Sequence, residues 1–240
     1  MKEHKQPDSR PLYKIFTAVP PSYDIINRIF TLTLDERWRK RAAKECLAGG
    51  PARVMDLCTG TGDLAIRLAG MSKGAVEITG YDYSAPMLEI ARQKSAKRGQ
   101  EKIVYLQGDA AAMPFPDGHF DSIGIAFAFR NLTFQNFDTP KFLAEINREL
   151  KPGGRFVIIE SSQPQWGWLR ALFRVYTRLF VYRMGGLISG NKPAYKYLSY
   201  SVIHYYYPEE ICDLLKQYGF TDVAFRRLSG GVAALHVAVK

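Results

Sequence analysis

The sequence predicts an α/β fold with a mostly parallel sheet and helices on both of its faces. Two observations carry this prediction. From residue 53 onward, short β-branched or apolar runs alternate with longer segments whose apolar residues recur at helical spacing. In addition, a glycine-rich loop follows the first of these runs, where a strand should pass into a helix. Such alternation is typical of parallel strands joined by helical crossovers.

The expected strands and helices follow one another in a regular order. Strands are expected at residues 53–57, 76–81, 103–107, 122–127 and 155–159. Helices are expected between them at residues 63–69, 85–98 and 140–150. The run Lys151-Pro152-Gly153-Gly154 should end the third helix in a turn. After Pro208, the pattern predicts a helix that stops at Gly219 and two strands joined by a turn at Gly230-Gly231.

A single domain of 240 residues is expected, because this length is ordinary for one α/β core. Its expected parts are an N-terminal helical cap (11–48), a central core (50–162), an aromatic-rich helical insertion (163–206) and a C-terminal helix with strands (208–240).

The composition limits the surroundings of the protein. Its 33 Lys+Arg and 23 Asp+Glu give a net charge of +10, which favours an anionic partner surface such as phospholipid or nucleic acid. The 3 cysteines are widely spaced, so no disulfide framework or metal site is predicted and a cytoplasmic location is expected. The sequence has no apolar signal core and no run of about 18 apolar residues, so any membrane contact should be peripheral.

The glycine loop Thr59-Gly60-Thr61-Gly62 points to a nucleotide-like ligand, because glycine lets the backbone approach a ligand closely. A dinucleotide loop would read G-x-G-x-x-G and bring a pyrophosphate to the helix N-terminus. Here Asp56 precedes the glycines and Asp63 follows them. Carboxylates repel a pyrophosphate and suit an amino group.

Two further carboxylates end the next strands. Asp82 closes the second predicted strand, and Asp109 follows the third. The carboxyl ends of parallel strands face one crevice, where open α/β sheets bind ligands, and a carboxylate at the position of Asp82 can accept hydrogen bonds from ribose hydroxyls. The alternative is that the glycines form a simple turn and each aspartate caps a helix. The combination of motifs favours the ligand.

With these motifs, residues 50–162 resemble the class I S-adenosylmethionine-dependent methyltransferases, which have a Rossmann-like fold. The resemblance implies that the first part of the motif holds the methionine moiety, Asp82 the ribose and the Asp109 turn the adenine edge. The implied cofactor-binding residues are Asp56, Gly60, Thr61, Gly62, Asp82, Asp109 and Ala110. The chain departs from the usual D-x-G-x-G-x-G pattern at Cys58, which replaces the first glycine.

Five separated motifs are similar to those of the C-methyltransferase family of menaquinone and ubiquinone biosynthesis. They are Tyr23-Asp24-x-x-Asn27 with Trp38, Thr59-Gly-Thr-Gly-Asp63, Phe129-Arg130-Asn131, Arg148 through Pro164, and Tyr195-x-Tyr197-Leu-x-x-Ser201 with Gly230-Gly231-x-x-x-Leu235-His236. A serine often found after the fourth strand of this family is Ala126 here. The resemblance implies methyl transfer from S-adenosylmethionine to a ring carbon of a prenylated quinol. Demethylmenaquinol is the preferred acceptor, with a benzoquinol of the ubiquinone pathway as the alternative.

Arg130 and Asn131 are the predicted catalytic residues. Carbon methylation needs an electron-rich ring, and a cation beside a ring hydroxyl favours its ionisation. Arg130 would supply that charge, and Asn131 would hold a ring oxygen. The alternative is a loop anchor in which Arg130 pairs with a carboxylate such as Asp138.

The same resemblance implies a set of substrate-binding residues. They are Tyr23, Asn27, Tyr195, Tyr197 and Ser201. For the last three, a core or rim position with a satisfied hydroxyl is an equal alternative. His236, in an apolar final strand, is expected to be structural.

Residues 166–183 form a basic amphipathic segment, in which Arg170, Arg174 and Arg178 fall four apart among aromatic and aliphatic residues. Such a helix lies in a membrane interface when its apolar face is exposed, and a prenylated quinol in the inner face of the membrane would require that access. The alternative is that the apolar face covers the sheet or the pocket.

Two other classes of function are disfavoured. The net charge suggests a nucleic-acid methyltransferase, but the sequence has no N-P-P-Y-type motif and no added binding domain, so no nucleic-acid partner is expected. A non-catalytic binding module would have no reason to keep the complete set of ligand residues.

Overall fold

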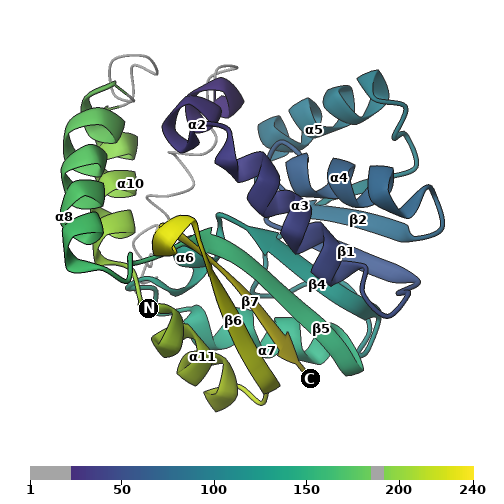
Figure 1. Ribbon diagram of the computed structural model, residues 1–240. Coiled ribbons are helices and arrows are strands. Elements are labelled where there is room, and N and C mark those ends of the chain that lie inside the picture. Colours follow the sequence, from purple (N-terminus) through teal and green to yellow (C-terminus); the bar gives the residue numbers. More distant parts are fainter. Residues whose placement is uncertain (1–22, 185–191) are drawn as a thin grey trace, which may run out of the picture.

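The computed structural model describes residues 23–184 and 192–240, which form a seven-stranded sheet with helices on both faces (Figure 1). The strands are β1 (Arg53–Leu57), β2 (Glu77–Asp82), β3 (Val104–Gln107), β4 (Phe120–Ala126), β5 (Leu150–Ser161), β6 (Thr221–Leu228) and β7 (Ala233–Val239). Their order in the sheet is β3-β2-β1-β4-β5-β7-β6. The first five strands are parallel, and β7 is antiparallel to both neighbours. The predicted fold class is confirmed.

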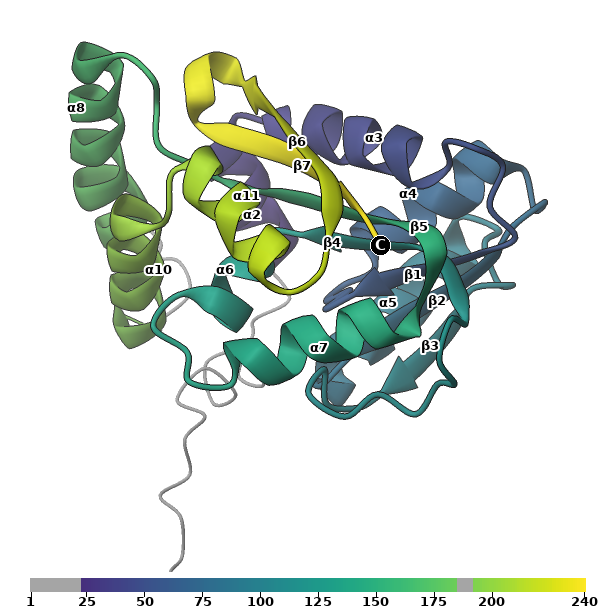
Figure 2. The same ribbon diagram turned by 90° about the horizontal axis from the view of Figure 1, so that it is seen from below.

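The helices cover the sheet from two sides (Figure 2). They are α2 (Tyr23–Thr31), α3 (Leu34–Cys46), α4 (Asp63–Ser72), α5 (Ala85–Lys97), α6 (Phe129–Thr133), α7 (Thr139–Glu149), α8 (Gly167–Tyr176), α10 (Lys192–His204) and α11 (Pro208–Gln217), with the short turns η1 (Thr177–Val181) and η2 (Ser229–Gly231). Helices α3, α4 and α5 pack on one face, and α6, α7 and α11 on the other. Helices α8 and α10 stand beside one end of the sheet (Figure 1).

The alternation of side chains along β5 explains why both faces are covered. Phe156 and Ile158 pack into the core beneath α7 and α11, while Val157 and Ile159 pack into the core beneath α3 and α4. All four are fully buried. Burial of each such side chain stabilises the fold by about 1.5–3 kcal/mol.

Helix α7 ends at Glu149, just before Lys151-Pro152-Gly153-Gly154, as predicted, but this run lies within β5, which begins at Leu150, instead of forming a separate turn. Leu150 pairs with Phe120 of β4. The backbone N–H of Gly153 donates to the carbonyl of Lys240 at 2.9 Å, and the N–H of Lys240 donates to the carbonyl of Gly154 at 3.0 Å. The last residue of the chain therefore satisfies the backbone of the segment and keeps it in the sheet.

The expected helical segments outside the core are present where the structure describes them. Helices α2 and α3 occupy residues 23–46 of the predicted cap, and residues 11–22 lie outside the described residues. Helices α8 and α10 occupy most of the predicted insertion. No helix in the described ranges is both long and apolar enough to cross a bilayer.

His236 of β7 is fully buried, as its expected structural role requires. Its Nε2 lies 3.2 Å from the carbonyl oxygen of Pro208, and its Nδ1 has no hydrogen-bond partner within the described residues. Burial lowers the pKa of His236 to about 4. As the pH falls below 6.5, the unfolded chain therefore binds this proton before the folded chain does, and stability is lost.

We therefore expect the free energy of unfolding between pH 7.5 and 5 to fall by about 2 kcal/mol more in the native protein than in His236→Gln. The comparison with the variant is needed because burial raises the pKa of Asp56 and of Glu149 to about 7, which acts in the opposite direction. Urea unfolding at both pH values measures the difference. Equal losses in the two proteins would show that His236 is not the group responsible.

Candidate active site

A cavity of about 850 Å³ lies at the carboxyl ends of the parallel strands and continues beneath α8 and α10. Its volume is within the range of ligand pockets, roughly 300–1,000 Å³. One end is lined by the glycine loop and by residues that follow β1, β2 and β3. The other end is lined by Arg130, Glu160 and aromatic or aliphatic residues of α8 and α10. One space thus joins a polar end to an apolar end.

The polar end of the cavity gathers negative charge in a chain whose net charge is +10. The carboxylates that line this end are Asp24, Asp35, Asp56, Asp63, Asp82 and Asp109. Asp35 pairs with Arg39, which also lines this end, and Asp24 and Asp63 pair with Lys94. The carboxylates still outnumber these cations, so this end favours a cationic ligand over a pyrophosphate. S-adenosylmethionine, with a sulfonium and an ammonium group, fits this charge.

Asp56 fixes the glycine loop to the start of α4. Its Oδ2 accepts a hydrogen bond of 2.6 Å from the Thr59 hydroxyl and one of 2.9 Å from the backbone N–H of Ala65. Because it is 1% exposed, burial raises its pKa to about 7. One of its two oxygens is thus committed to holding the loop.

The two glycines of the loop serve different purposes. Gly60 has φ +54° and lines the cavity, and a Cβ there would meet no atom within 4 Å, so the open space lies where a ligand would pass. Gly62 has φ +82°, and its Cβ would lie 2.6 Å from the hydroxyl of Tyr105. Gly62 does not line the cavity with the other described residues, so its part is to shape the loop.

Cys58, which replaces the first glycine of the D-x-G-x-G-x-G pattern, also adopts a left-handed conformation, with φ 53°. A non-glycine residue held there stores roughly 1–3 kcal/mol of strain. Cys58 lines the cavity, and burial raises the pKa of its thiol well above the ordinary value. The Cys58 side chain therefore lines the cavity as an uncharged thiol.

Asp82 closes β2 beside the glycine loop. Its Oδ2 accepts the backbone N–H of Gly60 at 2.8 Å, and its Oδ1 accepts that of Ser84 at 2.8 Å. Burial raises the pKa of Asp82, and these N–H groups act against that rise. A carboxylate has about four acceptor positions, so capacity for ribose hydroxyls is left.

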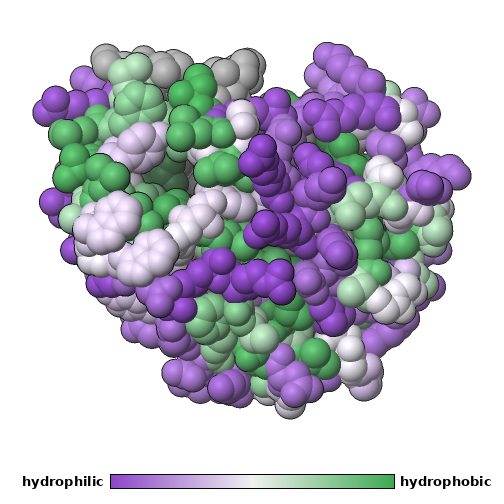
Figure 3. Space-filling model, viewed as in Figure 1, coloured by the Kyte–Doolittle hydropathy of each residue, from purple (hydrophilic) through white to green (hydrophobic). Residues whose placement is uncertain are grey.

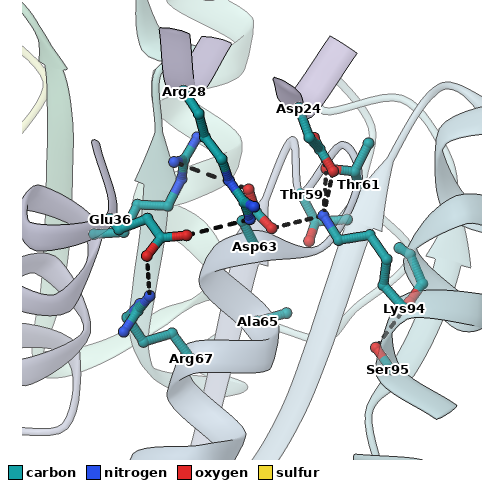
Figure 4. Close-up of polar contacts among 12 residues, drawn as sticks. Asp24, Arg28, Glu36, Thr59, Thr61, Asp63, Ala65, Arg67, Lys94 and Ser95 are labelled. Atoms are coloured by element: carbon teal, nitrogen blue, oxygen red, sulfur yellow. Dashed lines mark hydrogen bonds and ion pairs between the residues drawn. The ribbon is translucent and has the colours of Figure 1, made fainter. Parts of the chain in front are cut away.

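Asp109 and Ala110 both line the cavity after β3. The Oδ1 of Asp109 accepts the backbone N–H of Ala111 at 3.0 Å, which fixes the turn. Thr61 also lines the cavity, but its hydroxyl is engaged: it donates to Asp24 at 2.7 Å and accepts from Lys94 at 3.1 Å (Figure 4).

Arg130 is 3% exposed and lines the apolar end of the cavity. Its Nη1 donates to the Ser201 hydroxyl at 2.5 Å, and its Nε lies 3.9 Å from Glu160. The sequence suggested Asp138 as a possible carboxylate partner of Arg130. In the structure Asp138 pairs with Lys141 at 2.8 Å, and the carboxylate nearest to Arg130 is that of Glu160. Arg130 therefore joins α6 to β5 and α10 at the cavity wall.

Of four predicted site residues at the apolar end, three line the cavity and one lies behind its wall. Asn131, Tyr195 and Tyr197 line the cavity. Burial raises the pKa of Tyr197. Ser201 is fully buried and its hydroxyl is taken by Arg130, so within the described residues it stands behind the cavity wall. The side chains of Tyr23 and Asn27 lie outside the described residues.

Two residues of the site were not singled out from the sequence. Glu160, 1% exposed at the end of β5, lines the cavity and accepts the backbone N–H of Arg130 at 3.1 Å. A carboxylate ending an apolar strand was the signal that could have found it. Phe127, with φ 59°, also lines the cavity, and the Arg39 guanidinium lies 5.0 Å from its ring centroid.

The sheet order, the glycine loop and the carboxylates at the strand ends define a class I S-adenosylmethionine-dependent methyltransferase. The sequence model of the ubiE/COQ5 methyltransferase family matches residues 2–240. The chain belongs to this family.

Known proteins agree with this assignment. The chain is 44% identical to the demethylmenaquinone methyltransferase of Thermus thermophilus, over 93% of this chain and 98% of that protein. It is 40% identical to the protein of the same name from Deinococcus radiodurans, over 98% and 95% of the two chains. A solved S-adenosylmethionine-dependent methyltransferase of Aquifex aeolicus shares the fold, with a TM-score of 0.61, 22% identity and coverage of 94% and 96%.

Proposed function

We propose that the chain transfers the methyl group of S-adenosylmethionine to a ring carbon of demethylmenaquinol and so forms menaquinol. The observation that carries this proposal is the single cavity, which joins a carboxylate-lined end to an aromatic and aliphatic end beside Arg130. Relatives named demethylmenaquinone methyltransferase, over nearly the whole chain, support the choice of acceptor.

At the polar end, the chain binds and orients the cofactor, which when bound supplies an electrophilic methyl group. Asp82 accepts hydrogen bonds from the ribose hydroxyls with the acceptor positions that Gly60 and Ser84 leave open. The turn at Asp109 and Ala110 contacts the adenine edge, and Gly60 lets the methionine moiety approach the loop.

At the apolar end, Arg130 and Asn131 act on the acceptor. The Ser201 hydroxyl holds Nη1 of the guanidinium before the acceptor arrives, and the Glu160 carboxyl lies 3.9 Å from its Nε, so the orientation of the cation costs little when charge develops on the ring oxygen. A hydroxyl that is ionised beside Arg130 would push electron density to the ring carbon, which would take the methyl group as the carbon–sulfur bond of the cofactor breaks. Loss of the proton from that carbon to solvent would then restore the aromatic ring. Alignment of the two reactants in one cavity contributes further to the acceleration.

A labelled-methyl assay tests the proposal. Purified protein is incubated with S-adenosylmethionine and, separately, reduced demethylmenaquinone, a prenylated benzoquinol and RNA, without oxygen. Label is expected in demethylmenaquinol and not in its oxidised form, whose ring is electron-poor. Label in the benzoquinol alone would assign the chain to the ubiquinone pathway, and label in RNA would contradict the quinol proposal.

We also propose that α8 docks the protein on an anionic lipid surface at the inner face of the membrane. Trp168, Leu172, Val175 and Leu179 follow helical spacing on one face of α8 and its continuation, and each is more than half exposed: 68%, 59%, 52% and 52%. Figure 3 shows hydrophobic side chains gathered over this part of the molecule around a hollow. Within the described residues, this exposed face is therefore not packed on the sheet, whereas Leu169, Phe173 and Tyr176 of the same helix line the cavity, as the alternative of an apolar face over the pocket expects.

The charge and the cavity favour lipid as the occupant. Arg174 and Arg178 are exposed beside the apolar face. Arg170 instead donates a hydrogen bond of 2.9 Å to the Tyr207 hydroxyl, so it is not counted among the arginines that would contact lipid. Leu172 is both exposed and part of the cavity wall, so the apolar face is continuous with the acceptor end. A prenyl chain that remains in the bilayer would enter by this side.

We expect Trp168→Ser/Leu179→Ser to lower the affinity for phosphatidylglycerol vesicles by about tenfold, because two large apolar side chains leave the interface. Vesicle sedimentation measures this effect. The control Val104→Ser/Leu106→Ser removes exposed apolar side chains from β3, at the other side of the sheet, and should bind as the native protein does. Equal binding by both double variants would rule out α8 as the docking surface.

A further inference from the structure

Helix α2 spans the two ends of the cavity. Asp24, in its first turn, lines the polar end. Phe30, in its last turn, lines the apolar end and packs edge-to-face on Phe180 and on Tyr195, which also lines that end, with ring centroids 5.7 and 6.0 Å apart. In Figure 1, α2 lies between the α8–α10 pair and the α4–α5 side. The helix therefore contacts the polar end of the cavity with its first turn and the apolar end with its last turn.

Lys94 of α5 connects α2 to the glycine loop (Figure 4). Its Nζ lies 2.6 Å from the carboxylate of Asp24 and 2.6 Å from that of Asp63, and 3.1 Å from the hydroxyl of Thr61. The three charged side chains are 17–20% exposed. Charges so far removed from water interact more strongly than an exposed surface pair.

The two turns of α2 are held in different ways. Near the last turn, Thr31 donates to Asp35 at 2.7 Å, and Arg28 pairs with Glu36 at 3.2 Å, so this part follows α3. In the first turn, Asp24 contacts residues of α5 and the loop instead. Without Lys94, Asp63 would keep Arg39 at 3.9 Å, whereas Asp24 would lose the cation that joins it to Asp63, and the first turn of α2 would be held less firmly on the loop.

We propose that Lys94 is a positioning residue for cofactor binding: it holds α2 over the cofactor end of the cavity through Asp24, and it fixes the glycine loop through Thr61 and Asp63. Lys94 is not among the described residues that line the cavity, so it acts through the side chains that it holds. With α2 held in place over the cofactor end, the cofactor escapes more slowly.

Lys94→Met tests this role. We expect its affinity for S-adenosylmethionine alone, measured by calorimetry, to fall about tenfold, the size of a coupling within one ion network. The amides of α2 should exchange with solvent faster, while kcat at saturating cofactor changes less than about threefold, because Lys94 touches neither reactant. Lys94→Arg, which keeps the charge, should recover most of the affinity.

The matched control is Lys97→Met, which removes the same charge from an exposed position one turn further along α5. Asp24→Asn gives an independent test, because it leaves the pair of Lys94 and Asp63 in place and remains informative if Lys94→Met does not fold. We expect Asp24→Asn to weaken the affinity for S-adenosylmethionine as well. The affinity of the double variant Asp24→Asn/Lys94→Met should lie within about twofold of that of the weaker single variant. Cofactor binding by Lys94→Met equal to that of Lys97→Met would overturn the proposal, as would weaker binding with unchanged exchange in α2.

Discussion

Replacing Arg130 by lysine is expected to lower kcat by about 100-fold while the KM for the acceptor changes by less than about threefold, because the guanidinium acts on charge that develops in the transition state. An ammonium keeps the charge, but it cannot reproduce the planar guanidinium, whose Nη1 donates to Ser201 while its Nε lies 3.9 Å from Glu160. The measurement is steady-state kinetics with a quinol acceptor that is kept reduced.

Lysine is the sharper substitution because Arg130→Ala would leave the charge of Glu160 buried and unpaired, at a cost of about 3–5 kcal/mol of stability. The matched control is Arg155→Lys, another arginine paired with a glutamate, whose Nη2 lies 2.7 Å from Glu45 away from the cavity. Near-normal turnover of Arg130→Lys with a lower melting temperature would assign Arg130 to the fold and remove it from the catalytic residues.

Gly60→Ala is expected to weaken binding of S-adenosylmethionine by about 100-fold, since an added methyl group in an occupied site costs up to about 3 kcal/mol. The new Cβ would project into the open space of the cavity wall. Calorimetry with the cofactor alone measures this loss.

Gly99→Ala separates this effect from backbone strain. Gly99 has φ +65°, and its Cβ too would meet no atom within 4 Å, but it lies in a turn after α5 that does not line the cavity. Both alanine variants should therefore lose a similar free energy of unfolding, and Gly99→Ala should keep its affinity. Tight cofactor binding by Gly60→Ala would place the ligand elsewhere in the cavity.

The sequence predicted what local patterns and sheet geometry determine. Asp56, Asp82 and Asp109 lie around one cavity because parallel strands bring their carboxyl ends to one edge. The contacts between distant parts of the chain could not be predicted in this way. Ser201 lies 71 residues from Arg130, and only the packing of α10 shows that its hydroxyl supports the guanidinium instead of lining the pocket.

Two further differences have the same origin. The Thr61 hydroxyl is occupied by Asp24 and Lys94, which lie 37 and 33 residues away, so the loop motif alone did not reveal that it is already bound. Lys151-Pro152-Gly153-Gly154 has the composition of a turn, yet pairing with Lys240 extends the strand through it. Tertiary hydrogen bonds override local preference at these positions.

The carboxylates at the polar end of the cavity treat the reactant and the product of the cofactor differently. Methyl transfer breaks the bond between carbon and sulfur and turns a sulfonium cation into a neutral thioether. The attraction from the aspartates that line this end therefore falls at the moment when the product forms. Although Arg39 and Lys94 offset part of this negative charge, the remainder favours the cationic cofactor over its neutral thioether product and so favours their exchange after each turnover.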